Sequence, residues 1–340
     1  MALKVFSRDE VAAHHTAKSL WVTVNNKVYD ISHFIFDHPG GEEILLQFGG
    51  RDITKVLQDP SEHVHSDAAY DMLEPFYIGE LEAPTGGKGK SKGKAKASSD
   101  DSDTGVESSK VETFIDITKP MLRQVWVSNW NKEYYLKMVH IPRHAHNSAP
   151  IFGHPMLEIF SLTPWWVIPL FWLPIISYCA YDALQTVEPT RFLALFGVGL
   201  FNWTLIEYGL HRFLFHMEDL LPDHRIALTV HFLLHGIHHY LPMDRMRLVM
   251  PPALGFTLAY PIWSLYVYSF PNGIGQAMTS GSMLGFVLYD MVHYYIHHGR
   301  PYGSHLKEMK TYHLDHHYKN ANLGFGITSK FWDIVFNTLL

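Results

Sequence analysis

Histidines constrain this chain more than any other feature of it. They make up 24 of its 340 residues, and fourteen of the 24 fall between His211 and His317. The closely spaced groups are His211 and His216; His235, His238 and His239; His293, His297 and His298; and His313, His316 and His317. Residues three or four apart on a helix share one face, so these spacings predict helices that aim several imidazoles at one place.

Imidazoles in such numbers indicate a metal centre, because neutral imidazole is the commonest metal ligand in proteins. Ten of them are too many for one ion and suit two. Ligand type alone allows iron, zinc, copper or nickel. The single cysteine, Cys179, excludes a disulfide framework and a zinc site built from cysteines. The net charge of −6 provides no basic field, so no nucleic-acid partner is expected.

Four apolar stretches lie between residues 165 and 289, at 165–183, 192–208, 254–270 and 274–289. They are close to the lower limit of about 17–25 residues for a helix that crosses a bilayer. Charges are nearly absent inside them, and Trp and Tyr gather at their ends, which disfavours buried core helices of a soluble protein. The expected architecture is an all-α integral membrane domain with four transmembrane helices.

Positive charges are distributed unevenly between these stretches. Residues 211–247 and the tail after residue 289 are rich in Arg and Lys, whereas the other two connections carry almost none. Positively charged connections stay on the cytosolic side of a membrane. The histidine groups are expected to form a histidine-rich helical cap. Both termini and this cap are therefore expected in the cytosol.

Residues 1–82 read as a separate soluble domain. Ser7 and Glu10 form a capping box that opens a helix. Alternating apolar and polar residues around Asn25 and Asn26 predict a β-hairpin. His38 precedes Pro-Gly-Gly, a tight turn whose glycines allow the backbone to approach a flat ligand closely.

The segments WVTVNNKVYDIS, HPGG, FGGRDIT and HSDAAYDML resemble the cytochrome b5 domain. The resemblance implies a small α+β domain that binds haem b, with His38 and His65 as the two axial ligands. His63, two residues before His65, competes for the second position. Axial ligand choice and burial are the main means by which a protein controls such a cofactor.

Residues 83–113 consist mainly of Gly, Ser, Lys and Asp, a composition typical of a flexible linker. About 30 residues of flexible chain reach a root-mean-square distance of roughly 30 Å. The expected domains are therefore a haem domain at 1–82, a linker at 83–113 and the integral membrane domain at 114–340.

The histidine pattern on four apolar stretches resembles the fatty acid hydroxylase/sterol desaturase superfamily. The segments EYGLHRFLFH, HFLLHGIHHYLPMDRMRLVMPP and KTYHLDHHYKN carry the resemblance. The order of b5 domain, linker and spans is still more similar to the fatty acid 2-hydroxylases of sphingolipid metabolism. This resemblance implies a multi-pass monooxygenase of the endoplasmic reticulum membrane. It would hydroxylate C2 of long or very long fatty acyl chains within ceramide or destined for it.

The resemblance also implies the cofactors and partners. Electrons would pass from an NAD(P)H-cytochrome b5 reductase to the haem and then to two metal ions, with O2 as the oxidant. A tethered electron carrier has no use at a hydrolytic zinc site and fits iron, so a diiron centre is expected for activity, with zinc able to occupy it in purified protein. The other partners are a fatty acid, acyl or ceramide substrate and membrane lipids.

Spacing and resemblance together divide the ten histidines between two ions, although individual exchanges stay open. One site would hold His211, His216, His235, His239 and His316. The other would hold His238, His293, His297, His313 and His317, with His298 as a spare.

Acidic and aromatic residues beside the histidines are candidates for supporting roles. Asp290 and Tyr289 are the predicted catalytic residues, which with Tyr294 would meet the carbonyl headgroup of the substrate. Glu207, Asp244, Asp290 and Asp315 are candidate acceptors that orient imidazole rings.

Two other functions fit the same pattern. One is a fatty acyl desaturase or sterol C-4 methyl oxidase with the same ligands, which product analysis distinguishes. The other is a non-catalytic membrane sensor or carrier of metal or haem. A carrier would place histidines along a transmembrane path, whereas here they gather at one face, which favours a reaction site.

Overall fold

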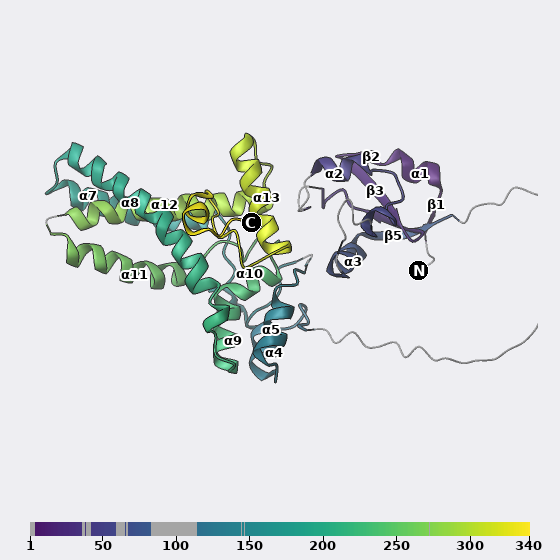
Figure 1. Ribbon diagram of the computed structural model, residues 1–340, viewed down its shortest axis with the longest axis horizontal. Coiled ribbons are helices and arrows are strands. Elements are labelled where there is room, and N and C mark those ends of the chain that lie inside the picture. Colours follow the sequence, from purple (N-terminus) through teal and green to yellow (C-terminus); the bar gives the residue numbers. More distant parts are fainter. Residues whose placement is uncertain are drawn as a thin grey trace, which may run out of the picture.

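The computed structural model describes residues 4–35, 38, 42–58, 65, 67–82, 114–143, 145, 147–271 and 273–340. The predicted linker 83–113, the Pro-Gly-Gly turn at 39–41 and His63 lie outside these residues. The described chain forms a small domain with one sheet and a helical domain (Figure 1). This confirms the expected combination of an α+β domain and an all-α domain.

The N-terminal domain is built on a five-stranded sheet in the order β1-β5-β4-β3-β2. Its strands are β1 (Val5–Phe6), β2 (His15–Thr16), β3 (Ser19–Val24), β4 (Lys27–Asp30) and β5 (Tyr77–Leu81). Its helices are α1 (Arg8–Ala13), α2 (Glu42–Gln47), α3 (Asp67–Leu73) and the short 3-10 turns η1 (Val56–Gln58) and η2 (Glu74–Phe76).

Local signals in the sequence account for the start of this domain. The Ser7 hydroxyl accepts a hydrogen bond from the Glu10 amide at 3.1 Å and caps α1, as the capping box predicts. Asn25 and Asn26 have positive φ angles of 49° and 64° and join β3 to β4. Asparagine tolerates this left-handed region, which matches the twist of a hairpin, so the predicted hairpin is confirmed.

Four long helices dominate the second domain: α7 (Val167–Leu184), α8 (Pro189–Gly209), α11 (Pro252–Ser269) and α12 (Ile274–His298). They lie side by side, and α12 packs against each of the other three (Figure 1). Close approach requires glycine at two positions. A Cβ atom at Gly199 would lie 2.0 Å from the Met278 carbonyl oxygen, and one at Gly281 would lie 2.0 Å from that of Phe196. Small residues at such contacts are characteristic of membrane helices.

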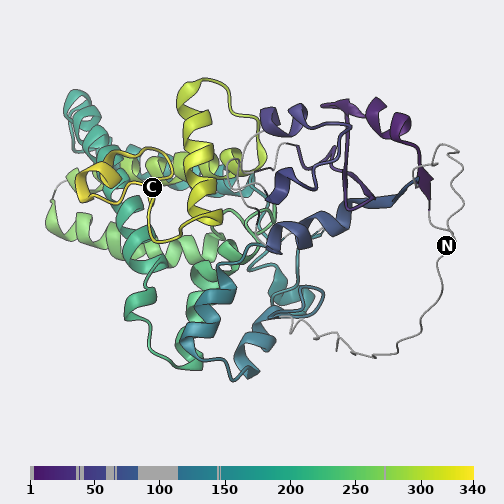
Figure 2. The same ribbon diagram turned by 45° about the vertical axis from the view of Figure 1, so that its right-hand side comes forward.

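The short helices gather at one end of the long ones, in both Figure 1 and the turned view of Figure 2. They are α4 (Met121–Val127), α5 (Lys132–Val139), α6 (Pro155–Glu158), η3 (Leu210–Phe215), η4 (Glu218–Leu220), α9 (Arg225–His231), η5 (Phe232–Gly236), α10 (Ile237–Tyr240), α13 (Ser304–Tyr318) and α14 (Phe331–Phe336). An apolar cluster that includes Tyr135, Phe232 and Tyr240 packs α5 against η5 and α10. This cap and the adjoining end of α12 carry the ten predicted metal ligands.

Two of the described helices are long and apolar enough to cross a membrane, Val167–Leu184 and the continuous run Pro189–Leu220. The other two predicted spans correspond to α11 and α12. Here α12 extends nine residues beyond the predicted end at residue 289, so that one helix joins the apolar bundle to the histidine cap.

Candidate metal centre

Four segments bring the ten predicted ligands together at the capped end of the bundle. The structure assembles them into two groups of five whose nearest nitrogen atoms all lie within 4.8 Å of one another. We call His211, His216, His235, His239 and His316 site A. We call His238, His293, His297, His313 and His317 site B. The two groups have the same members as the division expected from the sequence.

Site A depends on a helix type that the sequence reading did not anticipate. His211 and His216 are five residues apart, a spacing that would point them to different sides of an α-helix, about 140° apart. Segment η3 is instead π-helical, and the His216 amide donates to the His211 carbonyl at 3.0 Å. A π-turn closes bonds between residues five apart and is frequent at functional sites. A second π-turn, η5, contains His235.

Ring nitrogens converge within site A. The Nε2 atom of His216 lies 3.1 Å from the Nε2 atoms of His235, His239 and His316. An ion bound to imidazoles at about 2.0–2.1 Å holds its ligand atoms roughly 3 Å apart. The spacing of these nitrogens therefore fits a bound ion.

Site B has the same internal spacing. His293 Nε2 lies 3.1 Å from His238 Nε2 and 2.9 Å from His313 Nε2, and His313 Nε2 lies 3.1 Å from His317 Nε2. The two sites are neighbours, since the rings of His239 and His317 have centroids 4.4 Å apart. Two ions bound here would share one enclosed space.

Burial keeps these imidazoles in the form that binds metal. It lowers the pKa of His238 to about 3, and it lowers the pKa values of His313 and His317 well below their ordinary 6.5. The rings are therefore neutral at physiological pH. A neutral imidazole keeps one nitrogen lone pair for a metal, so the donor set suits a transition metal ion.

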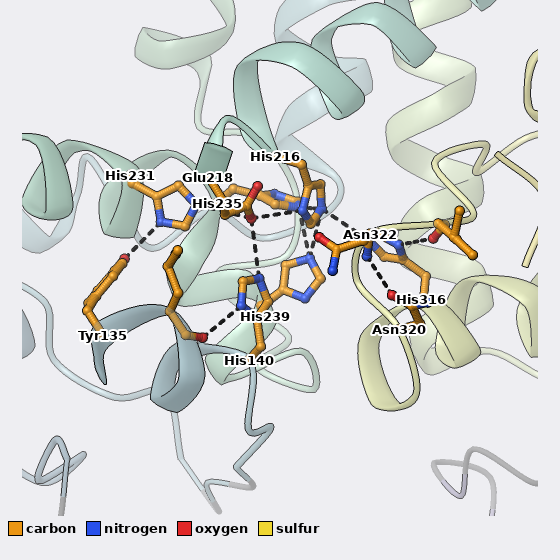
Figure 3. A network of polar contacts seen from close by, with 12 residues as sticks. Tyr135, His140, His216, Glu218, His231, His235, His239, His316, Asn320 and Asn322 are labelled. Carbon is orange, nitrogen blue, oxygen red and sulfur yellow. Dashed lines mark hydrogen bonds and ion pairs between the residues drawn. The ribbon is translucent and has the colours of Figure 1, made fainter. Parts of the chain in front are cut away.

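Glu218 supports site A, and sequence reasoning missed it. Its Oε1 accepts a hydrogen bond from His216 Nδ1 at 3.0 Å, and the Nε2 atoms of His140 and His231 lie 3.4 Å and 3.5 Å from the same oxygen (Figure 3). His231 in turn contacts the hydroxyl of Tyr135 at 2.9 Å. Its position two residues after His216 is the sequence signal that could have identified Glu218 as a support for that imidazole.

The acids expected to orient imidazoles have other partners. Glu207 accepts from the Thr328 amide at 3.1 Å and so holds the C-terminal loop. Asp290 accepts from the Met250 amide at 3.1 Å, and Asp315 pairs with a lysine on its own helix. Asp244 bonds loop residues around position 148. Within the described residues, no hydrogen bond joins these four carboxylates to an imidazole of either site.

The predicted catalytic residues lie on α12, three and four residues before the site B ligand His293. Tyr289 and Asp290 are buried, and the Tyr289 ring stacks at 5.8 Å from the ring of His293. Tyr294 packs 4.9 Å from the ring of His298, which belongs to neither site.

An apolar cavity runs from the histidine cap between the long helices. Its near end is lined by Leu210, next to His211, and by Met250, which bonds Asp290. It continues past Trp203 and Phe286 to Tyr266. Because α11 begins beside Asp290 and runs away from the cap, Tyr266 lies at the deep end. Its mostly apolar lining suits a hydrocarbon group, and none of the ten site histidines is among its lining residues.

In the N-terminal domain, His38 and His65 face one another. Their ring centroids are 6.4 Å apart and the rings are 24° from parallel. Phe34 packs edge-on against His38, and apolar residues of α2 and η1 pack against the same core. Two facing imidazoles in an apolar setting fit the axial positions of a haem.

Comparisons with known proteins agree with this geometry. Two family models match, a Cytochrome b5-like Heme/Steroid binding domain over residues 7–82 and a Fatty acid hydroxylase over residues 196–338. The ceramide very long chain fatty acid hydroxylase of Saccharomyces cerevisiae is 43% identical, and the match covers 99% of this chain and 95% of that protein. The fatty acid 2-hydroxylase of Rattus norvegicus is 34% identical over 98% of this chain and 95% of its own.

A solved structure is also similar. It is full-length scs7p with only the hydroxylase domain visible, and it is 48% identical with a TM-score of 0.65. The match covers 67% of this chain and 86% of that one.

Proposed function

This chain is an enzyme of the fatty acid 2-hydroxylase family, and on that premise we propose that it inserts one oxygen atom at C2 of long or very long acyl chains within ceramide or destined for it. The observation that carries the proposal is the convergence of ten histidines, nine of them buried, in two groups close to an apolar cavity whose lining includes Leu210, the neighbour of His211. A substrate tail in the cavity would place its polar end, and with it C2, beside the imidazoles.

Sites A and B would each hold one metal ion, and iron is the ion that this chemistry requires. Two reducible ions bound there would supply O2 activation and oxidation of an aliphatic C–H bond, which side chains alone cannot perform. Overall, one atom of O2 becomes the C2 hydroxyl and the other leaves as water, with two electrons and two protons supplied. Zinc fits the same imidazoles but cannot be reduced.

The chain's own residues bind and orient the substrate. Trp203 and Phe286 would contact the acyl tail, and burial of the tail there excludes water from the reacting carbon. The Asp290 carboxylate accepts a hydrogen bond from the Met250 amide. We therefore propose that Asp290 holds Met250 in place at the edge of the cavity and does not contact the substrate directly. The Tyr289 ring contacts the rings of Trp203 and His293, and it would form one wall of the space that holds the headgroup.

The N-terminal domain would donate the electrons. His38 and His65 would hold haem b, and the haem would supply electrons one at a time. Residues 1–82 form this domain in our proposal, 83–113 tether it, and 114–340 form the membrane hydroxylase. An NAD(P)H-cytochrome b5 reductase would reduce the haem.

We further propose four transmembrane helices, α7, α8, α11 and α12, in the endoplasmic reticulum membrane. Excess Arg and Lys at the histidine end supports a cytosolic position for both termini and for the metal centre. The haem domain and the metal centre would then occupy the same side.

The test is lipid mass spectrometry of membranes that contain the protein, with 18O2 as the oxidant. The expected product is a 2-hydroxyacyl lipid that carries one 18O atom, absent from membranes with His316→Ala and retained with His154→Ala, which lies outside both sites. A product with a new double bond or an oxidised sterol methyl group would refute 2-hydroxylation.

A further inference from the structure

The two histidine sites differ in what holds the far side of each ring. In site A, His211 Nδ1 donates to the Phe325 carbonyl at 2.6 Å, and His316 Nδ1 donates to the Leu323 carbonyl at 2.7 Å. His216 Nδ1 donates to Glu218. Three of the five rings are therefore held in orientation by a hydrogen bond at Nδ1.

Site B lacks this support. The Nδ1 atoms of His297, His313 and His317 are buried and have no protein hydrogen-bond partner among the described residues. In site A, the Nδ1 atom of His239 is likewise buried and has no protein hydrogen-bond partner among the described residues. No carboxylate of the described chain contacts a site B imidazole, whereas Glu218 contacts His216.

Such bonds matter because a carbonyl or carboxylate can only accept. Nδ1 must then carry the proton, which leaves the Nε2 lone pair directed at the ion and keeps the ring from turning. A carboxylate also raises the basicity of the imidazole that it contacts. Loss of one such partner typically costs about 10–100-fold in metal affinity.

Glu218 is itself held rigidly. Its side chain is 12% exposed, and His140 and His231 lie on either side of its Oε1 (Figure 3). Gly236 allows Tyr135 to approach His231, since a Cβ there would lie 2.8 Å from the Tyr135 hydroxyl. The carboxylate is thereby aimed at His216.

From this asymmetry we propose that site A retains its ion much longer than site B, and that Glu218 is the positioning residue responsible for a large part of the difference. The inference rests on the proposed function only in assuming that both sites bind metal. Site B, next to Tyr289, is then the site that exchanges its ion faster, and site A is the site that retains its ion.

The test measures metal and not turnover. Purified full-length protein is loaded with Zn2+ alone, exposed to excess EDTA, and assayed over time for bound zinc by mass spectrometry. The expected decay has two phases of one equivalent each. His313→Ala should remove the fast phase and His316→Ala the slow phase.

Glu218→Gln should accelerate the slow phase by about 10–100-fold and leave the fast phase unchanged. Asp219→Asn is the matched control, since it removes the same charge at the exposed neighbouring residue and should behave as the wild type. The circular dichroism of each variant reports whether it is folded.

Two results overturn the inference while leaving the proposed function intact. One is loss of both zinc equivalents from the wild-type protein in a single phase. This result can be read without any variant. The other is acceleration of the fast phase by Glu218→Gln. Protein that binds no zinc at either site would instead overturn the proposed metal centre.

Discussion

The hydroxyl of Tyr266 in α11 lies 3.3 Å from Oγ of Ser282 in α12, at the deep end of the apolar cavity. Asn202 in α8 donates to the same hydroxyl at 3.4 Å. Ser282 and His293 are 11 residues apart on α12, about 16 Å along its axis. In the four-helix membrane arrangement that we propose, this pairing offsets the cost of placing polar side chains inside the membrane.

Replacement of Tyr266 by alanine should lengthen the acyl chains that the enzyme uses. The ring forms the cavity floor, so its removal would let the tail extend further. One methylene in an apolar pocket changes specificity by about 10–200-fold. The ratio of longer to shorter 2-hydroxyacyl products should therefore rise by at least about tenfold, measured by mass spectrometry with mixed chain lengths supplied.

Two variants control for indirect effects. Tyr266→Phe keeps the ring and should leave the product distribution unchanged. Tyr260→Ala removes a tyrosine from the same helix that is 53% exposed and does not line the cavity. An unchanged distribution in folded Tyr266→Ala would show that the ring is not the floor of the acyl site.

Gly236 should be sensitive to a single added methyl group. A Cβ there would lie 2.8 Å from the Tyr135 hydroxyl and 3.3 Å from His231 Nδ1, in a buried part of the cap. Overpacking of this kind costs about 1–3 kcal/mol. Gly236→Ala should therefore lower the thermal unfolding midpoint of the detergent-solubilised protein.

Gly197→Ala is the matched control. Gly197 is also in a helix, and nothing lies within 4 Å of its Cβ position. Alanine is favoured over glycine in a helix by about 1 kcal/mol, so this variant should be unchanged or slightly more stable. Equal destabilisation by both substitutions would place the effect in the helix backbone and not in the contact with Tyr135.

Much of this architecture follows from the sequence because its signals are local. The histidine spacings, the capping box at Ser7 and the hairpin at Asn25 each depend on residues within one or two turns of chain. The grouping of the ten histidines also followed once they were placed on helices and compared with a known family. These features need no knowledge of distant contacts.

The remaining features depend on tertiary structure. A π-turn between His211 and His216 inserts one extra residue into a helical turn, and an α-helical projection cannot show it. Glu218 supports site A because α5 and α9 bring His140 and His231 to it from distant parts of the chain. Asp290 looks like a site acid in sequence but bonds Met250, forty residues away.

A partly buried ion pair between α6 and the loop after α10 should make stability depend on pH. Arg247 donates to Glu158 at 3.0 Å, and their side chains are 4% and 12% exposed. Burial alone would raise the pKa of Glu158, but amides of Gly153 and Phe152, with Arg247 and Ser161, hold it below its ordinary 4.5. A lowered pKa means that the contribution is complete above pH 4.5 and is lost as pH falls through the folded-state value.

Glu158→Gln should therefore be less stable than wild type at neutral pH, by about 1.5–3 kcal/mol for bonds to a charged group. The difference should shrink as pH falls below about 4.5. Thermal unfolding across this range measures it, with Glu133→Gln, an exposed acid, as the control. A difference that stays constant with pH would assign the loss to packing and not to the carboxylate charge.

Removal of residues 1–82 should starve the metal centre of electrons without dismantling it. The composition of 83–113 predicts a flexible tether, and a tether makes electron delivery intramolecular, at an effective concentration near millimolar for a short flexible linker. In membranes free of other b5, product per unit of protein should fall by about 10²-fold or more. Metal content should stay unchanged.

The full-length His38→Ala variant should show the same loss, because it removes a proposed haem ligand and keeps the domain. Excess separate b5 should restore part of the activity of both proteins, since it replaces the intramolecular donor with a bimolecular one. His316→Ala should not respond to added b5, because its defect lies in the metal centre. Full activity of the truncated enzyme in membranes without any other b5 would mean that the N-terminal domain is not the electron donor.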